Sequence, residues 1–566
     1  MQYYKSYLDE KDLNFGKLEF LDNKFCVNDQ EVLNNRAIIN DIVYIKNQEI
    51  VGIKERTIKN IVGILYLDFK IKYGNINNKA LFLFKPTCKS YSNFYIPYNN
   101  SKTNKIYVII QFKEWKVNDK LPIGTLIDVL GDVGEKEVEF EHFRYFFEIH
   151  NKTWKIDNKI KNEHLKILSD LESVKEDYQI FSIDPIGSKD IDDAFHFKIN
   201  ENGNYEVGIH IASPTKFLEN NLEDILNRVS TIYTPIKNYN LIPNLYAEEL
   251  VSLLENKKRY SLSLILNFYE NEIIKYELKE AIVKNIKNYH YEEFDKIYYK
   301  DKNLNHFVNF TKKFFELSII DSHKLVENWM IYSNKFVARY LIEKNLKNVI
   351  LRVHNSNNII NNELDMENEL KEYMILRNEN SALYEIYDEE VLNQQHSKLG
   401  NKFYTHFTSP IRRAIDFFIH ILIIKNKDRL DKNELQKIID KINIFTKNSR
   451  KFDRNIKRLD FLYSISSLND NKNIITHGYI VKITKNKLSL YIPQYNLEEK
   501  VIIIPYKFEK IVEIKCNQNE DDMIDKIEYI IDNVKKEYCL YQKLEIKLWV
   551  FTSFENIFDK LKVEIL

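Results

Sequence analysis

Four aspartates lie within one short stretch, SIDPIGSKDIDDAFHF: Asp184, Asp190, Asp192 and Asp193. Crowded carboxylates repel one another and raise one another's pKa, so folding alone gives no reason to gather them. A divalent cation gives such a reason, because Mg²⁺ takes oxygen ligands and prefers one or two carboxylates together with a substrate phosphate. The stretch is therefore a candidate magnesium site.

Two simpler interpretations of this stretch compete with metal catalysis. One is a solvated acidic loop, and the other is a calcium loop with ligands at alternate positions, then a glycine, then a distant glutamate. Asp190, Asp192 and Asp193 break that alternation, and no glycine stands at the required place. The residues of the loop leave metal catalysis and a solvated acidic loop both open.

The surrounding pattern predicts where these carboxylates lie. Residues 179–183 read as a strand that Asp184-Pro185 ends, and residues 194–199 read as the next strand. Asn202-Gly203 is a hairpin signal, after which residues 205–212 return antiparallel. The carboxylates are thus expected at a loop between two strands, where a rigid scaffold commonly carries catalytic groups.

A second constellation is YTHFTSPIRRAID at residues 404–416. Pro410 indicates a nearby helix start, with Thr408 and Ser409 as N-cap candidates. This places Arg412 and Arg413 in the first helical turn, where cations oppose the helix dipole. A bound anion would account for them, since guanidinium groups and helix N-termini both suit phosphate. Two surface arginines at a solvated helix start are the alternative.

Other basic and aromatic residues are compatible with RNA. A helix is expected over about 433–468, and helical spacing puts Arg450, Arg454 and Lys457 roughly on one face, which either tracks an RNA backbone or is a solvated face. Tyr233 lies in a turn-rich segment, where a ring can stack on a base. With 37 tyrosines in the chain, any one of them can equally be a packing residue.

Bulk properties describe a soluble, intracellular protein. The chain has 566 residues with 83 basic and 83 acidic side chains, so any basic footprint must be local. Its four cysteines have no metal-binding spacing and suit a reducing compartment. The N-terminus has no apolar signal core, and the longest apolar runs are too short to span a membrane. We therefore expect a cytoplasmic location and no membrane partner.

The arrangement of elements predicts a multidomain α+β protein. Short alternating strands fill residues 1–63 and 64–150, residues 151–470 mix strands with later helices after a helical connector, and residues 471–566 return to strands. Small barrels of this kind commonly bind oligonucleotides, although structural β modules fit equally well.

The motifs resemble, in the same order, those of the RNase II / ribonuclease R (RNB) family of 3′→5′ exoribonucleases. The matching segments are IDPIGSKDIDDA, VGIHIA, STIYTP, RYSLSL, SHKLVENWMIYSNKFVA, RVH and YTHFTSPIRR. The resemblance implies OB-fold cold-shock barrels at 1–63 (weakly marked) and 64–150, an RNB catalytic domain at 151–470 and an S1-type OB-fold barrel at 471–566.

The same resemblance implies roles for individual residues. Asp184, Asp190, Asp192 and Asp193 would bind or position two Mg²⁺ ions, for which Mn²⁺ is a substitute. Asp192 and Arg412 would be catalytic, with Arg412 on the scissile phosphate. The RNA-binding set would be Tyr233 on the 3′-terminal base, Glu327 on a ribose 2′-hydroxyl, and Arg413, Arg450 and Arg454.

The implied activity is processive hydrolysis of single-stranded RNA from a free 3′ end to nucleoside 5′-monophosphates. A monomer is expected, with an RNA helicase or a degradation complex as a further partner. Lys457 stands where the family usually has an acidic residue, which puts product release, processivity and final product length in question. An RNA-binding regulator that has lost turnover is therefore the alternative.

Overall fold

The computed structural model describes residues 14–566 with internal gaps. The residues outside the description are 1–13, 22–23, 29, 35, 57–58, 68–72, 89, 100–103, 117, 150–153, 155, 202, 235, 237, 355–366, 380–381, 390–402, 426–430, 467–472, 485, 504–510, 519–523, 532–533 and 552–559. The chain divides into two compact units, residues 1–150 with 451–566, and residues 151–450. Each unit is described by itself.

The first unit begins with two small sheets made of alternating strands. The first has the order β3-β2-β1-β4-β5. In the second, an extra pairing of β6 with β8 closes the ring β6-β10-β11-β9-β8, and Leu65, Phe84 and Val108 fill it. The strands are β1 Asn14–Leu21, β2 Lys24–Val27, β3 Gln30–Glu31, β4 Ile42–Lys46, β5 Glu49–Glu55, β6 Asn60–Tyr66, β7 Asn75–Ile76, β8 Lys79–Pro86, β9 Phe94–Tyr98, β10 Lys105–Glu114 and β11 Ile123–Asp132. Because β6 begins at Asn60, the predicted division after residue 63 falls inside a strand.

The C-terminal part of this unit is also built of strands. A five-stranded sheet has the order β21-β20-β19-β25-β26, and β22-β23-β24 form a separate antiparallel sheet between β21 and β25 in the chain. The strands are β19 Asn473–Thr484, β20 Lys487–Ile492, β21 Leu497–Ile502, β22 Ile511–Gln518, β23 Ile524–Ile531, β24 Val534–Cys539, β25 Lys543–Val550 and β26 Leu561–Ile565. An S1-type barrel is consistent with this order and stays a prediction.

The second unit is organised around a closed five-stranded barrel, β12-β13-β14-β15-β16. Its strands are β12 Tyr178–Asp184, β13 Asp193–Ile199, β14 Tyr205–Ala212, β15 Lys258–Tyr269 and β16 Glu272–His290. The last strand, β16, returns parallel to β12 and closes the ring. The predicted hairpin of β13 and β14 is present, with Asp193 opposite Ile211.

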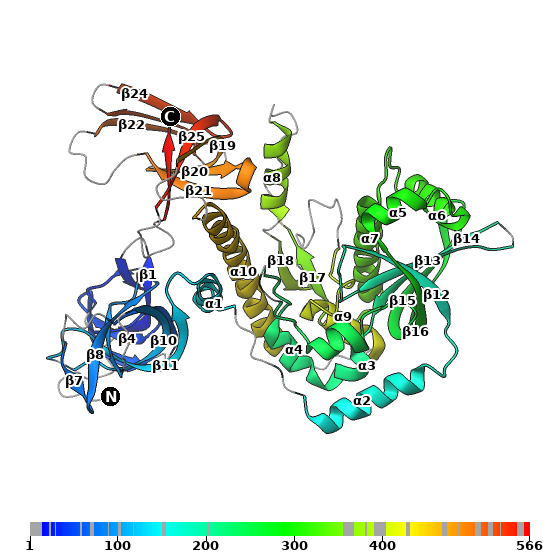
Figure 1. The fold of residues 1–566 in the computed structure, drawn as a ribbon, viewed down its shortest axis with the longest axis horizontal. Helices are drawn as coiled ribbons and strands as arrows, with labels where there is room; N and C mark the ends of the chain where they lie inside the picture. The colour runs from blue at the N-terminus through cyan, green and yellow to red at the C-terminus, as the bar shows by residue number, and fades with distance from the viewer. Residues whose placement is uncertain are drawn as a thin grey trace. The chain divides into compact units, whose positions relative to one another are not determined.

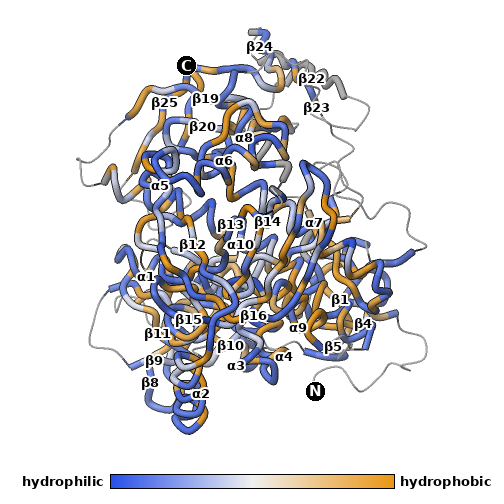
Figure 2. Tube along the Cα trace, turned by 90° about the vertical axis from the view of Figure 1, so that its right-hand side faces the viewer, coloured by the Kyte–Doolittle hydropathy of each residue, from blue (hydrophilic) through white to orange (hydrophobic). Residues whose placement is uncertain are grey.

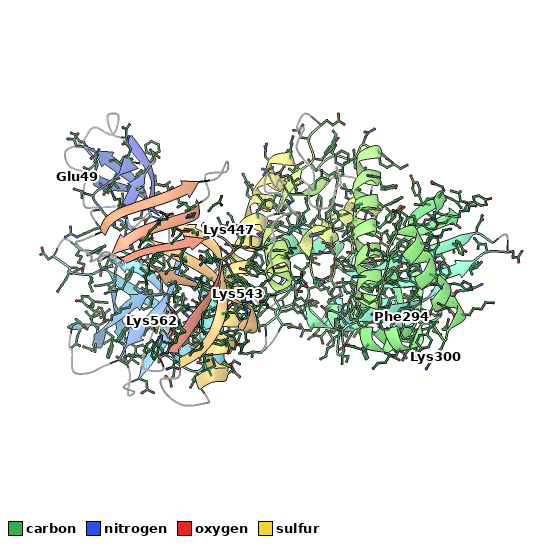
Figure 3. All side chains as sticks on the ribbon, turned by 90° about the horizontal axis from the view of Figure 1, so that it is seen from above. Glu49, Phe294, Lys300, Lys447, Lys543 and Lys562 are labelled. Carbon is green, nitrogen blue, oxygen red and sulfur yellow. The ribbon has the colours of Figure 1, made fainter. Side chains whose placement is uncertain are left out.

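Helices of this unit pack against the barrel and around α9 (Figure 1). Trp329 of α7 is fully buried and stacks on Phe307 and Phe314 of α6. Phe294 of α5, which is labelled in Figure 3, stacks on Phe181 of β12. The helices are α2 Asn158–Leu171, α3 Thr215–Leu218, α4 Leu222–Arg228, α5 Tyr291–Ile297, α6 Lys302–Phe314, α7 Ser322–Glu343, α8 Asn368–Glu379, α9 Ala414–Lys425 and α10 Lys432–Ser466. Strands β17 Ile350–Val353 and β18 Leu383–Ile386 pair antiparallel beside them, and α1 Lys136–Phe146 belongs to the first unit.

Together these parts form the multidomain α+β protein that the sequence predicts. The long helix α10 begins at Lys432 as expected, and the compact unit that carries the barrel ends at Arg450, in the middle of this helix. The end of the catalytic domain at residue 470 stays a prediction. Within the described residues, no helix is long and apolar enough to cross a membrane.

Helix α9 is apolar nearly all round, as its colour shows (Figure 2). It lies in the core of its unit. Its two buried polar residues are Asp416 and His420. The His420 Nε2 lies 3.0 Å from the Phe407 carbonyl oxygen, which can only accept, so Nε2 carries the proton. The buried Nδ1 atom has no partner.

We predict that His420 makes this unit acid-sensitive. Burial lowers the pKa of His420 from 6.5 to about 3, so its contribution is complete above pH 6.5 and is lost as the pH falls toward 3. Between pH 7 and pH 5 the loss is about 2 kcal/mol. Thermal unfolding at both pH values should show a smaller acid loss for His420→Gln, whose amide keeps a donor. An equal acid loss in both proteins would contradict this prediction.

Candidate active site around the aspartate loop

The aspartate loop joins β12 to β13 and is fixed by backbone contacts. The Ser252 hydroxyl accepts from the Ile191 N–H at 2.9 Å and donates to the Lys189 carbonyl at 2.7 Å. The Asp192 carbonyl accepts from the Ala212 N–H at 2.8 Å, and Ile191 is buried in the core. Asp190 and Asp192 therefore lie within a loop that is fixed by its contacts, and Asp184 and Asp193 lie where β12 ends and β13 begins, close to the position that the sequence predicts.

Asp192 connects this loop to the second constellation. Its Oδ1 accepts from the Ile411 N–H at 3.1 Å, and its Oδ2 accepts from the Arg412 Nε at 3.0 Å. Asp192 is 5% exposed, and burial raises its pKa to about 7, against the lowering effect of Arg412 and the Ile411 N–H. Two motifs 220 residues apart thus meet in one charge-assisted contact.

Asp184 and Asp193 are partly buried beside Asp192. Burial raises the pKa of Asp184 to about 6, and Asp190 adds to the rise. Burial also raises the pKa of Asp193 well above its ordinary value, and the carboxylates of Asp184 and Asp192 raise it further. When all of these carboxylates are ionised, additional positive charge nearby would therefore reduce their mutual repulsion.

These residues fit a cation whose remaining ligands come from the substrate. Among the described residues, no three histidine, cysteine, aspartate or glutamate side chains are grouped as a ready set of metal ligands. Mg²⁺ does not need such a set, since it is commonly held by one or two carboxylates plus phosphate oxygens. The buried Asp184 Oδ2 has no hydrogen-bond partner and is the kind of acceptor that a cation would satisfy.

Tyr233 lies at the same loop through Asp190. Its hydroxyl donates to the Asp190 Oδ2 at 2.7 Å, and burial together with this bond raises the pKa of Tyr233. The residue is 47% exposed, so part of it remains accessible. The sequence suggested only a stacking ring and gave no sign of this hydrogen bond.

The arginine turn differs from the predicted helix start. Helix α9 begins at Ala414, so Arg412 lies in a turn and Arg413 in a bridge to Ser230. Ser409 is not the N-cap of α9, because the helix begins only at Ala414 and the Ser409 hydroxyl accepts from the Arg412 Nη2. The helix begins later than predicted because tertiary contacts, and not helix capping, hold residues 409–413.

The Arg413 guanidinium, which we expected to bind RNA, pairs with a carboxylate of α9. Its Nη2 lies 2.8 Å from the Asp416 Oδ1, and its Nε is buried without a partner. Arg412 is therefore the member of the pair that contacts the aspartate loop, while the Arg413 guanidinium pairs with Asp416. Binding of RNA by Arg413 stays a prediction.

Glu327 lies on α7 and is exposed. His323, one helical turn earlier, stacks on Tyr291 with ring centroids 3.7 Å apart. Burial raises the pKa of Tyr291 to about 12, and Asp193 and Asp184 add to the rise, so this ring lies near the carboxylates. Tyr291 and His323 were not identified from the sequence, which has many tyrosines and gives neither residue a distinctive spacing.

The two predicted arginines of α10 have contacts in different units. The Arg450 Nη2 donates to the Ala382 carbonyl at 3.4 Å, in the unit that holds the barrel. The Arg454 Nη1 lies 3.7 Å from the Glu498 Oε2 in the other unit. Their role in RNA binding stays a prediction.

Parts of the chain match known protein families. The RNB domain model matches residues 170–320 and 307–426, and the model of the Dis3-like cold-shock domain 2 (CSD2) matches residues 81–143. The chain is 24% identical to the exosome complex exonuclease RRP44 of Homo sapiens over 89% of its length, and it spans 60% of that relative.

Solved structures share the fold. One is Mycoplasma genitalium RNase R in complex with ribose methylated single-stranded RNA, with a TM-score of 0.73, 17% identity, and coverage of 98% of this chain and 100% of that chain. Another is yeast Ssd1, a pseudonuclease, with a TM-score of 0.66, 14% identity, and coverage of 99% and 98%. At these identities, the likeness concerns the fold alone.

We predict that Asp193→Asn stabilises the protein in EDTA. The change removes one partly buried charge that its neighbours disfavour, and a gain of about 1 kcal/mol is typical of relieving such a functional-site conflict. The rise in melting temperature that Mg²⁺ gives the native protein should shrink in this variant. Thermal unfolding with EDTA or Mg²⁺ checks both effects.

The exposed Asp170 on α2 provides a control, because Asp170→Asn should change stability by less than about 0.5 kcal/mol. A lower melting temperature of Asp193→Asn in EDTA, or an unchanged response to Mg²⁺, would count against the placement of a cation at this carboxylate.

Proposed function

We propose that this chain, a member of the RNB family of exoribonucleases, is a processive 3′→5′ exoribonuclease that hydrolyses single-stranded RNA to nucleoside 5′-monophosphates. One observation carries the proposal: the contact of Asp192 with Arg412 and the Ile411 N–H. It joins a loop that suits a metal to a guanidinium that suits a phosphate.

Each residue has a defined part in the proposed reaction. A guanidinium has five N–H donors, so Arg412 can contact Asp192 and Ser409 and still donate to an oxygen of the scissile phosphate. Asp184 and Asp193 would hold Mg²⁺ (Mn²⁺ as a substitute), with Asp190 and Asp192 positioning it. Two bound ions would supply an activated water and charge compensation for the leaving oxygen.

The proposed substrate is single-stranded RNA with a free 3′ end. Tyr233 would place its ring on the 3′-terminal base, and Glu327 would address a ribose 2′-hydroxyl, the group that distinguishes RNA from DNA. We further propose that the chain acts as a monomer, with an RNA helicase or a degradation complex as a partner. Both can be sought by sizing and by co-purification.

The alternative is an RNA-binding regulator without turnover. Lys457 favours it, since a cation stands where the family usually has an acid, and the fold is also that of a pseudonuclease. In the structure Lys457 lies one helical turn after Asp453 on α10 and lowers the pKa of that carboxyl, against the larger effect of burial. The Asp192–Arg412 contact favours an active enzyme.

Incubation of the protein with 5′-labelled single-stranded RNA tests the proposal. With Mg²⁺ we expect a ladder or a short limit product together with nucleoside 5′-monophosphates, and with EDTA intact RNA. Asp192→Asn should retain RNA binding and abolish shortening, whereas Asp170→Asn should behave as the native protein. RNA that is bound but never shortened would establish the regulator and refute the enzyme.

Tyr233 offers a test of 3′-end binding. Tyr233→Ala removes the ring and should lengthen the limit product or weaken 3′-end binding, because stacking on a base contributes about 1–3 kcal/mol. Tyr233→Phe keeps the ring, loses only the bond to Asp190 and should give the native product length. Denaturing gels of the limit products compare the three proteins. An identical product pattern for Tyr233→Ala would exclude Tyr233 from the site.

A further inference from the structure

Asp416 is a buried carboxylate in the first turn of α9 and is 0% exposed. Its Oδ1 accepts from the Ser409 N–H at 2.7 Å and from the Arg413 Nη2 at 2.8 Å. A buried charge is costly unless it is paired and hydrogen-bonded. A neutral residue at this position would avoid the free-energy cost of burying a charge. The presence of an aspartate therefore needs a reason other than helix formation.

The contacts of Asp416 lead to the catalytic turn. The Ser409 whose N–H it holds uses its own hydroxyl to accept from the Arg412 Nη2 at 2.9 Å. Arg412 in turn donates through Nε to Asp192. Asp416 is therefore linked to Asp192 through Ser409 and Arg412, in a turn that Asp192 grips from its other side.

The pairing with Arg413 is incomplete in an informative way. Asp416 Oδ2 and Arg413 Nε are both buried without partners, although they belong to a carboxylate and a guanidinium that could form two parallel bonds. Oδ1 is shared between Arg413 and the Ser409 N–H. Asp416 therefore forms one bond fewer to Arg413 than a bidentate pair would, and it keeps its hydrogen bond to the Ser409 N–H in the turn.

Backbone contacts hold the other side of the turn. The Arg412 carbonyl accepts from the Thr231 N–H at 2.9 Å, and the Ala414 N–H donates to the Val229 carbonyl at 2.9 Å. These contacts fix the main chain after the arginine. Before it, the Ser409 carbonyl accepts from the N–H groups of Arg412 and Arg413, and Asp416 is the residue that holds the Ser409 N–H.

We propose that Asp416 is a positioning residue, which holds the Ser409–Arg412 turn so that Arg412 and the Ile411 N–H are placed for the reaction. This inference rests on the proposed function. Asp416 is fully buried and contacts the Ser409 N–H and the Arg413 guanidinium, so it would act through the turn.

The test compares Asp416→Asn with the native full-length protein. An asparagine can still accept from the Ser409 N–H but no longer forms an ion pair with Arg413. The turn should therefore keep its hydrogen bond to residue 416 and be held less firmly. We expect kcat on a short single-stranded RNA to fall about 10-fold to 100-fold, the loss that a small misplacement of a catalytic group causes. The Kd for the same RNA in EDTA should stay within about twofold of the native value, because a misplaced group impairs the orientation needed for reaction more than it impairs binding.

A second readout is independent of activity. Hydrogen–deuterium exchange of residues 407–414 should become faster in Asp416→Asn. If the native protein shortens no RNA, the proposed function fails, and this exchange still decides whether Asp416 holds the turn. Unchanged exchange, unchanged kcat, or a fall in RNA affinity that matches the fall in kcat would each overturn the inference.

Asp41 gives a matched control. It is also fully buried, accepts from a backbone N–H (Ile38, 2.8 Å) and pairs with an arginine (Arg56, 3.4 Å), but it lies directly before β4 in the other unit. Asp41→Asn should lower stability and leave kcat on a short RNA unchanged. If Asp416→Asn does not fold, Ser409→Ala removes only the hydroxyl link to Arg412 and should give a smaller fall in kcat. No fall in that variant would also overturn the inference.

Discussion

The contact of Asp192 with the Ile411 N–H and the Arg412 guanidinium is the constraint on which the rest of the site depends. It is made between a strand–loop of the barrel and the turn before α9, so neither motif is placed without the other. The contact also explains how a carboxylate with 5% exposure is tolerated, since a charged donor and a backbone donor both compensate it. The barrel, α9 and the loop between them are the scaffold of this one junction.

The cost of that junction is visible in its neighbours. Asp184, Asp192 and Asp193 all have raised pKa values because burial and mutual repulsion disfavour their charged forms. A fold selected for stability alone would avoid such a group. Arg412 offsets only part of this negative charge. The burial of Asp192 does not suit a solvated acidic loop, and the remaining charge is what the proposed cation would compensate.

Much of this was predictable from local patterns, and the exceptions have a common cause. The β13–β14 hairpin, the position of the aspartate loop and the long helix α10 follow from turn signals and periodicity, which depend on nearby residues. The start of α9, the pairing of Arg413 with Asp416 and the hydrogen bond of Tyr233 to Asp190 depend on tertiary contacts that no local pattern encodes. Capping rules predicted a helix at residues 411–413, but tertiary hydrogen bonds override them there.

Val229 shows how far this tertiary control extends. It follows α4 with a φ of 69°, a conformation that a β-branched residue adopts only under constraint. Its N–H donates to the Ile225 carbonyl, and its own carbonyl accepts from the Ala414 N–H, so the strained residue is tied to the start of α9. Backbone strain of this kind costs about 1–3 kcal/mol and persists only where the surroundings over-determine it. Here the surroundings are the Arg412 turn and the segment that carries Tyr233, so the strain at Val229 is maintained by contacts between the two segments that reach the aspartate loop through Arg412 and Tyr233.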